Sequence, residues 1–168
     1  ITKNNALPIY DKLGAHPMKI NSISGVHFAV WAPNAMRGSV VGDFNGGDGR
    51  FHQMRRLWDS GIFELFIPCA NVGDNYKYEI KLKGGKTFLK ADPYGNQAQL
   101  RPNTASVVAD LSKFKWSDEN WMADRKNFKP EKEAMSVYEV YLGSFARGED
   151  GSYVNYRELA QKNGRAHV

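Results

Sequence analysis

The sequence has little cysteine, little histidine and no long hydrophobic run, and each shortage excludes a class of protein. Its 168 residues include one cysteine, Cys69, so no internal disulfide can form and a reducing compartment is favoured. One cysteine and four dispersed histidines offer no metal-ligand spacing, and we expect neither metal nor cofactor. No segment approaches the roughly 18 consecutive apolar residues of a membrane helix, and the first residues lack the apolar region of a signal peptide. We therefore expect a soluble, cytoplasmic protein without a membrane partner.

The composition that is present suits a packed domain. Hydrophobic residues make up 42% of the chain and aromatic residues 12%, which excludes disorder as the natural interpretation. The net charge of +5 is spread over many strands instead of clustering, and no nucleic-acid-binding motif accompanies it. We interpret the basic residues as the solvated face of a sheet and expect no nucleic-acid partner.

Short apolar segments bounded by Gly, Asn and Asp recur through the first two thirds of the chain. Ser60-Gly61 and Gly84-Gly85 each separate two such segments in the manner of a hairpin turn. Seven strands at this spacing predict an all-β domain, an immunoglobulin-like β-sandwich of roughly 100 residues. The predicted strands are 25–31, 38–44, 52–57, 61–67, 75–82, 87–90 and 105–109, and residues 1–19 are interpreted as an irregular approach.

The pattern changes near residue 110. We assign 1–110 to the sandwich, 111–134 to a charged and aromatic linker, and 135–168 to the start of a second domain. Met135 to Leu142 has the β-branched and aromatic character of a buried parallel strand, and a helix is predicted from Tyr156. A parallel sheet requires repeated βα units. The last segment is therefore incomplete by itself, and we expect the sequence to be part of a longer protein.

Five motifs, in order along the chain, resemble the N-terminal region of glycogen branching enzymes, with similarity from about residue 7 to residue 162. The motifs are Tyr10-Asp11-Lys12-Leu13-Gly14-Ala15-His16, Phe28-Ala29-Val30-Trp31-Ala32-Pro33-Asn34-Ala35 with Val40-Val41-Gly42-Asp43-Phe44-Asn45-Gly46, Tyr76-Lys77-Tyr78-Glu79-Ile80, Lys90-Ala91-Asp92-Pro93-Tyr94-Gly95, and Val137-Tyr138-Glu139-Val140-Tyr141-Leu142-Gly143-Ser144-Phe145.

This resemblance implies a carbohydrate-binding module of the family 48 type, followed by the first strand and helix of an α-amylase-type (β/α)₈ barrel. The parent enzyme would be a glycosyltransferase of glycogen biosynthesis, transferring α-1,4-glucan segments to form α-1,6 branches with a carboxylate nucleophile and a carboxylic acid/base. Those residues lie on later barrel strands. The resemblance therefore assigns no catalytic residue to this chain, Glu139 included, and predicts no activity for it alone. The implied partners are α-glucan, bound weakly, and the catalytic barrel.

Sugar rings pack on flat aromatic or proline surfaces, which makes two segments candidates for glucan contact. Trp31 and Pro33 end a predicted strand, where the indole can either meet a sugar or cap the core; both interpretations stay open. Trp58 and Asp59 lie at a predicted hairpin tip, as a sugar platform or as ordinary surface residues. The resemblance adds Lys77, which matches a lysine that relatives direct at sugar hydroxyls; a cross-strand charge beside Glu79 or Glu64 is the alternative.

Two positions depart from the pattern of glycogen-binding relatives. Gly47 stands where many members carry a tryptophan, and Leu89 stands near the place of a second aromatic platform. Loss of one aromatic stacking contact costs about 1 kcal/mol. We therefore expect a weak binder that guides long glucan chains.

Three other functions remain alternatives. The first is the same module in a debranching enzyme or a trehalose-releasing hydrolase. The second is a stand-alone glycogen-binding module, which has no use for the barrel-like segment after Met135. The third is a structural domain whose sugar site has decayed, which Gly47 and Leu89 favour.

Overall fold

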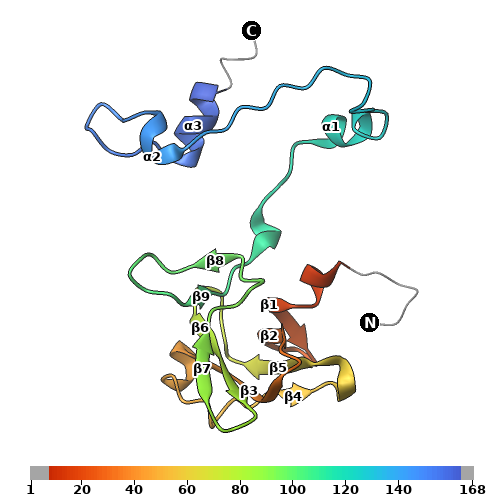
Figure 1. Cartoon of the computed structure of the whole chain (residues 1–168), viewed down its shortest axis with the longest axis vertical. Coiled ribbons are helices and arrows are strands. Elements are labelled where there is room, and N and C mark those ends of the chain that lie inside the picture. Colours follow the sequence, from red (N-terminus) through yellow and green to blue (C-terminus); the bar gives the residue numbers. More distant parts are fainter. Residues whose placement is uncertain (1–7, 164–168) are drawn as a thin grey trace. The chain divides into compact units, whose positions relative to one another are not determined.

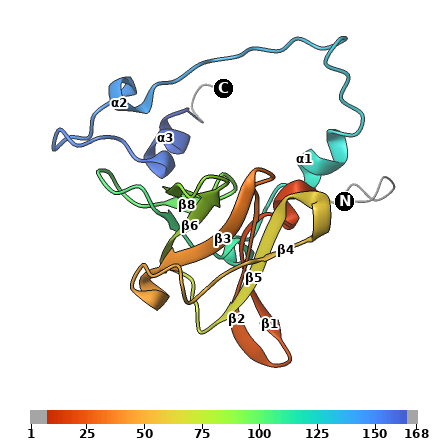
Figure 2. The ribbon, with the colours of Figure 1, turned by 60° about the horizontal axis from the view of Figure 1, so that its bottom comes forward.

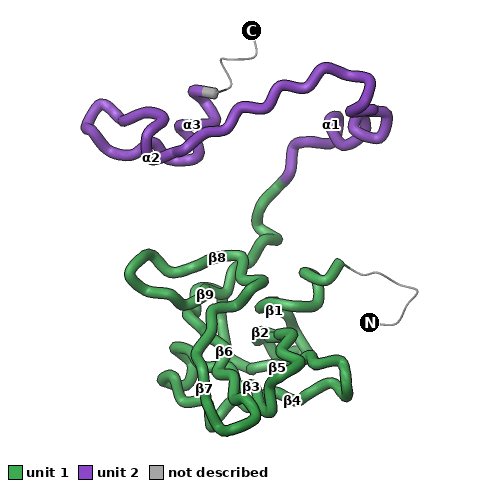
Figure 3. The backbone as a smooth tube through the Cα atoms, in the orientation of Figure 1, with its two compact units in different colours: residues 1–115 green, residues 116–168 purple. Residues whose placement is uncertain are grey.

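The structure is a computed structural model that describes residues 8–163. The ends of the predicted first and last domains, residues 1–7 and 164–168, lie outside the described residues. The chain forms two units, divided between Lys115 and Trp116 (Figure 3). All the strands among residues 8–163 lie in unit 1, and unit 2 contains short helices (Figure 1).

The first sheet of unit 1 has the strand order β1-β2-β5-β4, and every pair is antiparallel (Figure 2). Its strands are β1 (Gly14–Ile20), β2 (Ile23–Trp31), β4 (Arg55–Arg56) and β5 (Ile62–Pro68). The turn at Ser60-Gly61 joins β4 to β5, which confirms the predicted hairpin. Strand β1 was not predicted, because Gly14-Ala15-His16-Pro17 lacks alternation. Its position at the sheet edge tolerates the proline.

The second sheet has the order β3-β6-β9-β8, with β7 also pairing with β6. Its strands are β3 (Ala35–Gly42), β6 (Asn75–Leu82), β7 (Thr87–Lys90), β8 (Gln97–Ala98) and β9 (Ser106–Val107). Strands β7 and β9 follow one another along the same edge of β6. The predicted ranges 75–82 and 87–90 match β6 and β7, and the Gly84-Gly85 hairpin is confirmed.

Two connections carry the chain from one sheet to the other. The turn after Trp31 leads from β2 in the first sheet to β3 in the second. Residues 52–54 then run along β3, where the Val40 amide donates to the His52 carbonyl at 2.9 Å, before the chain enters β4 of the first sheet. Four short 3₁₀ segments complete unit 1: η1 (Ile9–Asp11), η2 (Asp43–Asn45), η3 (Trp58–Ser60) and η4 (Leu111–Lys113).

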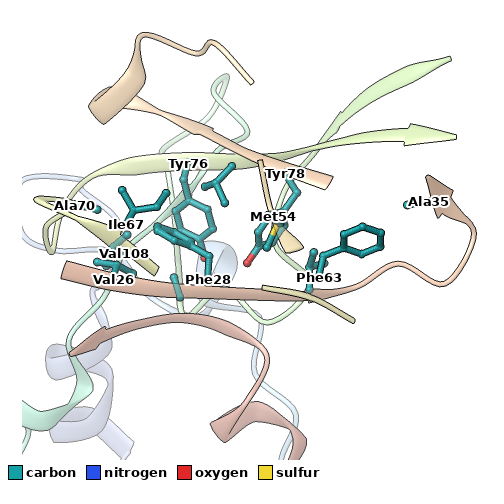
Figure 4. Close-up of a cluster of buried hydrophobic side chains, with 13 residues drawn as sticks. Val26, Phe28, Ala35, Met54, Phe63, Ile67, Ala70, Tyr76, Tyr78 and Val108 are labelled. Carbon is teal, nitrogen blue, oxygen red and sulfur yellow. The ribbon is translucent and has the colours of Figure 1, made fainter. Parts of the chain in front are cut away.

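The core lies between the two sheets, so unit 1 is a β-sandwich. Alternate residues of β2 and β6 point inward, and Phe28, Tyr76 and Tyr78 are fully buried between the layers (Figure 4). The Phe28 and Tyr76 rings meet edge to face at a centroid distance of 5.0 Å. The predicted all-β architecture is therefore correct for this unit. Cys69 is exposed.

A carboxylate is buried beside these tyrosines. Asp92 accepts hydrogen bonds from the hydroxyls of Tyr76 at 2.7 Å and Tyr78 at 3.1 Å, and from the Tyr94 amide at 2.8 Å. Burial and the Asp92 charge raise the pKa of both tyrosines well above the ordinary value. Both phenols therefore stay protonated and serve as donors.

Unit 2 contains the helices α1 (Glu119–Asp124), α2 (Leu142–Phe145) and α3 (Tyr156–Asn163). The helix predicted from Tyr156 is confirmed, and α1 lies within the predicted linker. The predicted strand from Met135 to Leu142 is wrong for this chain: residues 135–141 form no strand, and Val137 and Tyr138 are exposed. The physical reason is that a buried parallel strand requires strands on both sides, and none of the described strands lies in unit 2. Within residues 8–163, no helix is long and apolar enough to cross a membrane.

Candidate functional site

Trp31 is the last residue of β2 and lies on the outer face of the first sheet. Its neighbour Val30 is buried in the core, whereas the Trp31 side chain is 60% exposed. The indole N–H donates to the Ser60 carbonyl at 3.2 Å, which fixes the ring over the β4–β5 turn. Trp31 therefore does not cap the core.

Trp58 opens the η3 turn and is 91% exposed. The turn is held by its own serine: the Ser60 hydroxyl donates to the Leu57 carbonyl and accepts from the Ile62 amide at 3.1 Å. Asp59, the next residue after Trp58, is also exposed. The structure thus presents one indole almost free of protein contact on an ordered turn.

The two turns meet, and they bring four of the predicted site residues together. The Ala32 amide donates to the Gly61 carbonyl at 2.8 Å. Gly61 has φ +72°, and a Cβ there would lie 2.7 Å from the Pro33 Cα. We call the surface formed by Trp31, Pro33, Trp58 and Asp59 the tryptophan edge.

Lys77, the fifth predicted residue, lies elsewhere. It points outward from β6, between the buried Tyr76 and Tyr78, and so lies on the outer face of the second sheet. Its ammonium donates to the Thr104 hydroxyl at 2.8 Å. The alternative of an ion pair with Glu79 or Glu64 is not seen: Glu79 pairs with Arg37, and Glu64 pairs with Arg55 and Lys12.

Lys77 lines a groove of about 510 Å³ on this second face, together with Asp43, Gly46, Gly47, Asn75 and Gln99. The loop that forms one wall is fixed by Asn45, whose side-chain oxygen accepts from the Gly42 amide at 2.9 Å and the Gly47 amide at 3.2 Å. Asp43 accepts two hydrogen bonds from Asn75 across the groove. These hydrogen bonds hold the loop and the start of β6 together beside the groove.

The groove has no exposed aromatic ring among its lining residues. A Cβ added at Gly47 would meet nothing within 4 Å, so the position is open to solvent. Leu89 is exposed on β7, opposite Glu79, and is not part of the lining. Ser106 is not part of the lining either: it is buried, and its hydroxyl accepts a hydrogen bond from the Asp92 amide at 2.9 Å.

The groove residues that sequence reasoning missed are Asp43, Asn75 and Gln99. Asp43 was expected inside the predicted strand 38–44. Asn75 and Gln99 both line the groove because β9, which follows the 99–105 loop, pairs with β6. In the loop that follows Gly47, the Arg50 guanidinium donates hydrogen bonds to the Asp48 carboxylate and lowers the pKa of that carboxyl to about 2.

Among the described residues, no group of three or more His, Cys, Asp or Glu side chains could hold a metal ion. The site features are instead exposed indoles on ordered turns and an open polar groove, on two outer faces of a sandwich. Such an arrangement defines a module that binds a ligand on its surface.

Comparison with known proteins specifies this class. Residues 12–95 match the family Carbohydrate-binding module 48 (Isoamylase N-terminal domain). The chain belongs to this family. The matched range includes all five predicted site residues.

Curated relatives agree over nearly the whole chain. The 1,4-alpha-glucan branching enzymes GlgB of Gloeobacter violaceus and Cellvibrio japonicus are 52% and 50% identical over 157 and 155 residues, each match covering 92% of this chain and 21% of the relative. That of Synechococcus elongatus is 53% identical over 137 residues, which are 82% of this chain and 18% of the relative. The chain thus spans about a fifth of the length of these relatives.

Proposed function

We propose that this chain is the glucan-guiding, carbohydrate-binding part of a cytoplasmic 1,4-α-glucan branching enzyme. The observation that supports the branching type, rather than a debranching enzyme or a trehalose-releasing hydrolase, is identity of about 50% to branching enzymes over 92% of the chain. The whole protein would transfer α-1,4-glucan segments to form α-1,6 branches. This chain alone would hold the substrate and perform no chemistry.

In this proposal the sandwich is immunoglobulin-like and residues 135–163 are the first βα unit of the catalytic barrel. Residues 135–141 would become a strand only when neighbouring barrel strands supply hydrogen-bond partners, because an isolated parallel strand has none. The exposed apolar side chains of this segment, Val137 and Tyr138 among them, support this assignment, because they would be buried in the core of a complete barrel.

The tryptophan edge is the proposed main glucan contact. Trp31 and Trp58 offer two exposed apolar ring surfaces, while Asp59 lies beside them as an acceptor for sugar hydroxyls. Lys77 and the groove amides on the other face would make only polar contacts, since Gly47 and Leu89 remove the aromatic platforms. A glucan that contacts only a few solvent-exposed rings is expected to bind weakly, as a module that guides long chains requires.

The test is a titration of the chain with maltoheptaose, followed by tryptophan fluorescence and amide chemical shifts. We expect saturable shifts at Trp31 and Trp58 in the millimolar range, and Trp58→Ala to weaken binding by about 1 kcal/mol, the worth of one aromatic contact. Trp121→Ala is the matched control, because that indole in unit 2 is as exposed as Trp31. A folded chain that gives no shifts at millimolar sugar would refute glucan binding and favour the structural-domain alternative.

A further inference from the structure

A second pocket, of about 380 Å³, opens on the outer face of the first sheet. We call it the Glu64 pocket. Its lining includes the polar side chains of Lys12, His27, Arg55 and Glu64 and the apolar side chains of Ile20 and Phe66. None of these residues belongs to the tryptophan edge or to the Lys77 groove.

Glu64 is the unusual member of this pocket. Its side chain is only 9% exposed. One carboxylate oxygen, Oε1, accepts two hydrogen bonds from the Arg55 guanidinium. The other, Oε2, is buried and accepts no hydrogen bond from any described residue, although Lys12 Nζ and His27 Nε2 each lie 3.5 Å away. A buried carboxylate oxygen that accepts no hydrogen bond destabilises the fold, unless a bound ligand supplies the donor.

Glu64 is ionised at neutral pH. Burial by itself would raise the pKa of this carboxyl, but the hydrogen bonds from Arg55 and the positive charge of Lys12 outweigh burial, so that the pKa lies below its ordinary value. His27 is neutral, because burial lowers the pKa of its imidazole. The pocket therefore holds one carboxylate, two cations and one neutral imidazole.

This charge arrangement discriminates between ligand classes. An anion would face the Glu64 carboxylate, and a cation would face Lys12 and Arg55. A neutral ligand with adjacent hydroxyl groups satisfies both: one hydroxyl donates to Glu64 Oε2, while its neighbour accepts from Lys12. The apolar faces of Phe66 and Ile20 provide a wall for the C–H face of a sugar ring.

The pocket shares a face with the tryptophan edge. Trp31, Ala29 and His27 are successive outward residues of β2, and they pair with Ile62, Glu64 and Phe66 of β5. Trp31 is therefore two residues along the strand from the Ala29–Glu64 pair, or roughly 7 Å. Between the two places, Ala29 and Ile62 are buried in a small apolar cluster with Leu13 and Leu57, so a ligand chain that reaches both must cross this cluster.

We propose that the Glu64 pocket is a second sugar subsite, in which the vicinal hydroxyls of one glucose unit of an α-glucan bind Glu64 and Lys12. This inference rests on the proposed function, because it assumes that the glucose unit in the Glu64 pocket belongs to the same α-glucan that contacts the tryptophan edge.

The test is the maltoheptaose titration with a second set of reporters, the ring signals of His27 and the side-chain signals of Arg55. We expect both to shift together with Trp31. Lys12→Met should lower the affinity about threefold to tenfold, the worth of one hydrogen bond. Lys12 is half exposed, so the domain should fold normally. Lys19→Met is the matched control, because Lys19 is an exposed lysine of strand β1 that does not line the pocket.

The outcomes separate the inference from the proposed function. Shifts at Trp31 and Trp58 without shifts at His27 and Arg55 would overturn the subsite and leave the module a glucan binder. Shifts in the pocket caused by sodium phosphate and not by maltoheptaose would make it an anion site and overturn the subsite. Equal affinities for Lys12→Met and Lys19→Met would also overturn it. The absence of shifts anywhere would refute both proposals.

Discussion

Asp92 joins several buried polar groups of the sandwich in one hydrogen-bond network. It accepts hydrogen bonds from two buried phenols and from the Tyr94 amide, and its own amide donates to Ser106. The sequence Asp92-Pro93-Tyr94-Gly95 predicts a turn, and the Gly95 amide donates to the Asp92 carbonyl at 3.1 Å, which confirms it. The pattern gives no sign of the second role, because Tyr76 and Tyr78 are distant in sequence.

Asp92→Ala should reduce the free energy of unfolding by roughly 2–4 kcal/mol, because it removes the acceptor of the buried Tyr76 hydroxyl and leaves the Tyr78 hydroxyl only its longer contacts with the Ala29 and Gly14 carbonyls. Asp92→Asn keeps one carbonyl oxygen and should cost less. The measurement is urea unfolding followed by circular dichroism.

Asp59→Ala is the control for Asp92, since Asp59 is exposed and its loss should change stability by less than about 0.5 kcal/mol. Equal effects of Asp59→Ala and Asp92→Ala would contradict the role assigned to the buried carboxylate.

The element that positions the tryptophan edge is the η3 turn between β4 and β5. Its conformation depends on Gly61, which combines a positive φ with close contact to Pro33. Gly46 also has a positive φ, +60°, but a Cβ there would meet nothing within 4 Å. Alanine at Gly46 would therefore introduce backbone strain alone, whereas alanine at Gly61 would introduce backbone strain and steric overlap.

Gly46→Ala should destabilise the sandwich by about 1–2 kcal/mol, the cost of a left-handed backbone for alanine. Gly61→Ala should cost about 1 kcal/mol or more beyond that, because Pro33 must also move. Thermal unfolding of both variants provides the comparison. A Gly61→Ala protein as stable as the Gly46→Ala protein would show that the contact with Pro33 is not tight.

Other elements show where sequence patterns succeed. Strands β6 and β7 were predicted to the residue, because alternation and Gly84-Gly85 both define them. The segment 38–44 was predicted to continue through Phe44, but β3 ends at Gly42. The Asn45 side chain binds the Gly42 amide and turns residues 43–45 into η2 instead.

At the scale of the whole molecule, the two units differ in how much apolar surface they bury. Unit 1 has a continuous core, whereas unit 2 exposes many large apolar side chains: Trp116, Trp121, Met135, Val137, Tyr138, Tyr141 and Tyr156. Exposed apolar surface of this kind promotes association. Backbone without secondary structure, as in residues 129–141, is also the preferred site of proteolysis.

We therefore expect limited trypsin digestion to cut first between residues 125 and 133, at Arg125, Lys126 or Lys132, and to leave a resistant product that contains unit 1. Residues 1–115 alone should unfold at the same urea midpoint as the full chain and bind less of a hydrophobic dye. Mass spectrometry of the digest and parallel unfolding curves test this. Earlier cleavage within 14–107, or a lower midpoint for residues 1–115, would show that the sandwich needs unit 2.

The sequence alone determined the sandwich, most of its strands, both hairpins and the family, because these depend on local alternation, turn residues and motifs that are contiguous along the chain. The tertiary structure decided which residues meet. It joined Trp31 and Pro33 to the turn at Trp58, placed Lys77 on the opposite outer face, and gathered Lys12, His27 and Arg55 around the buried Glu64. It also left residues 135–141 without a strand. Strand order and sheet pairing join residues far apart in sequence, and one chain's local pattern does not encode them.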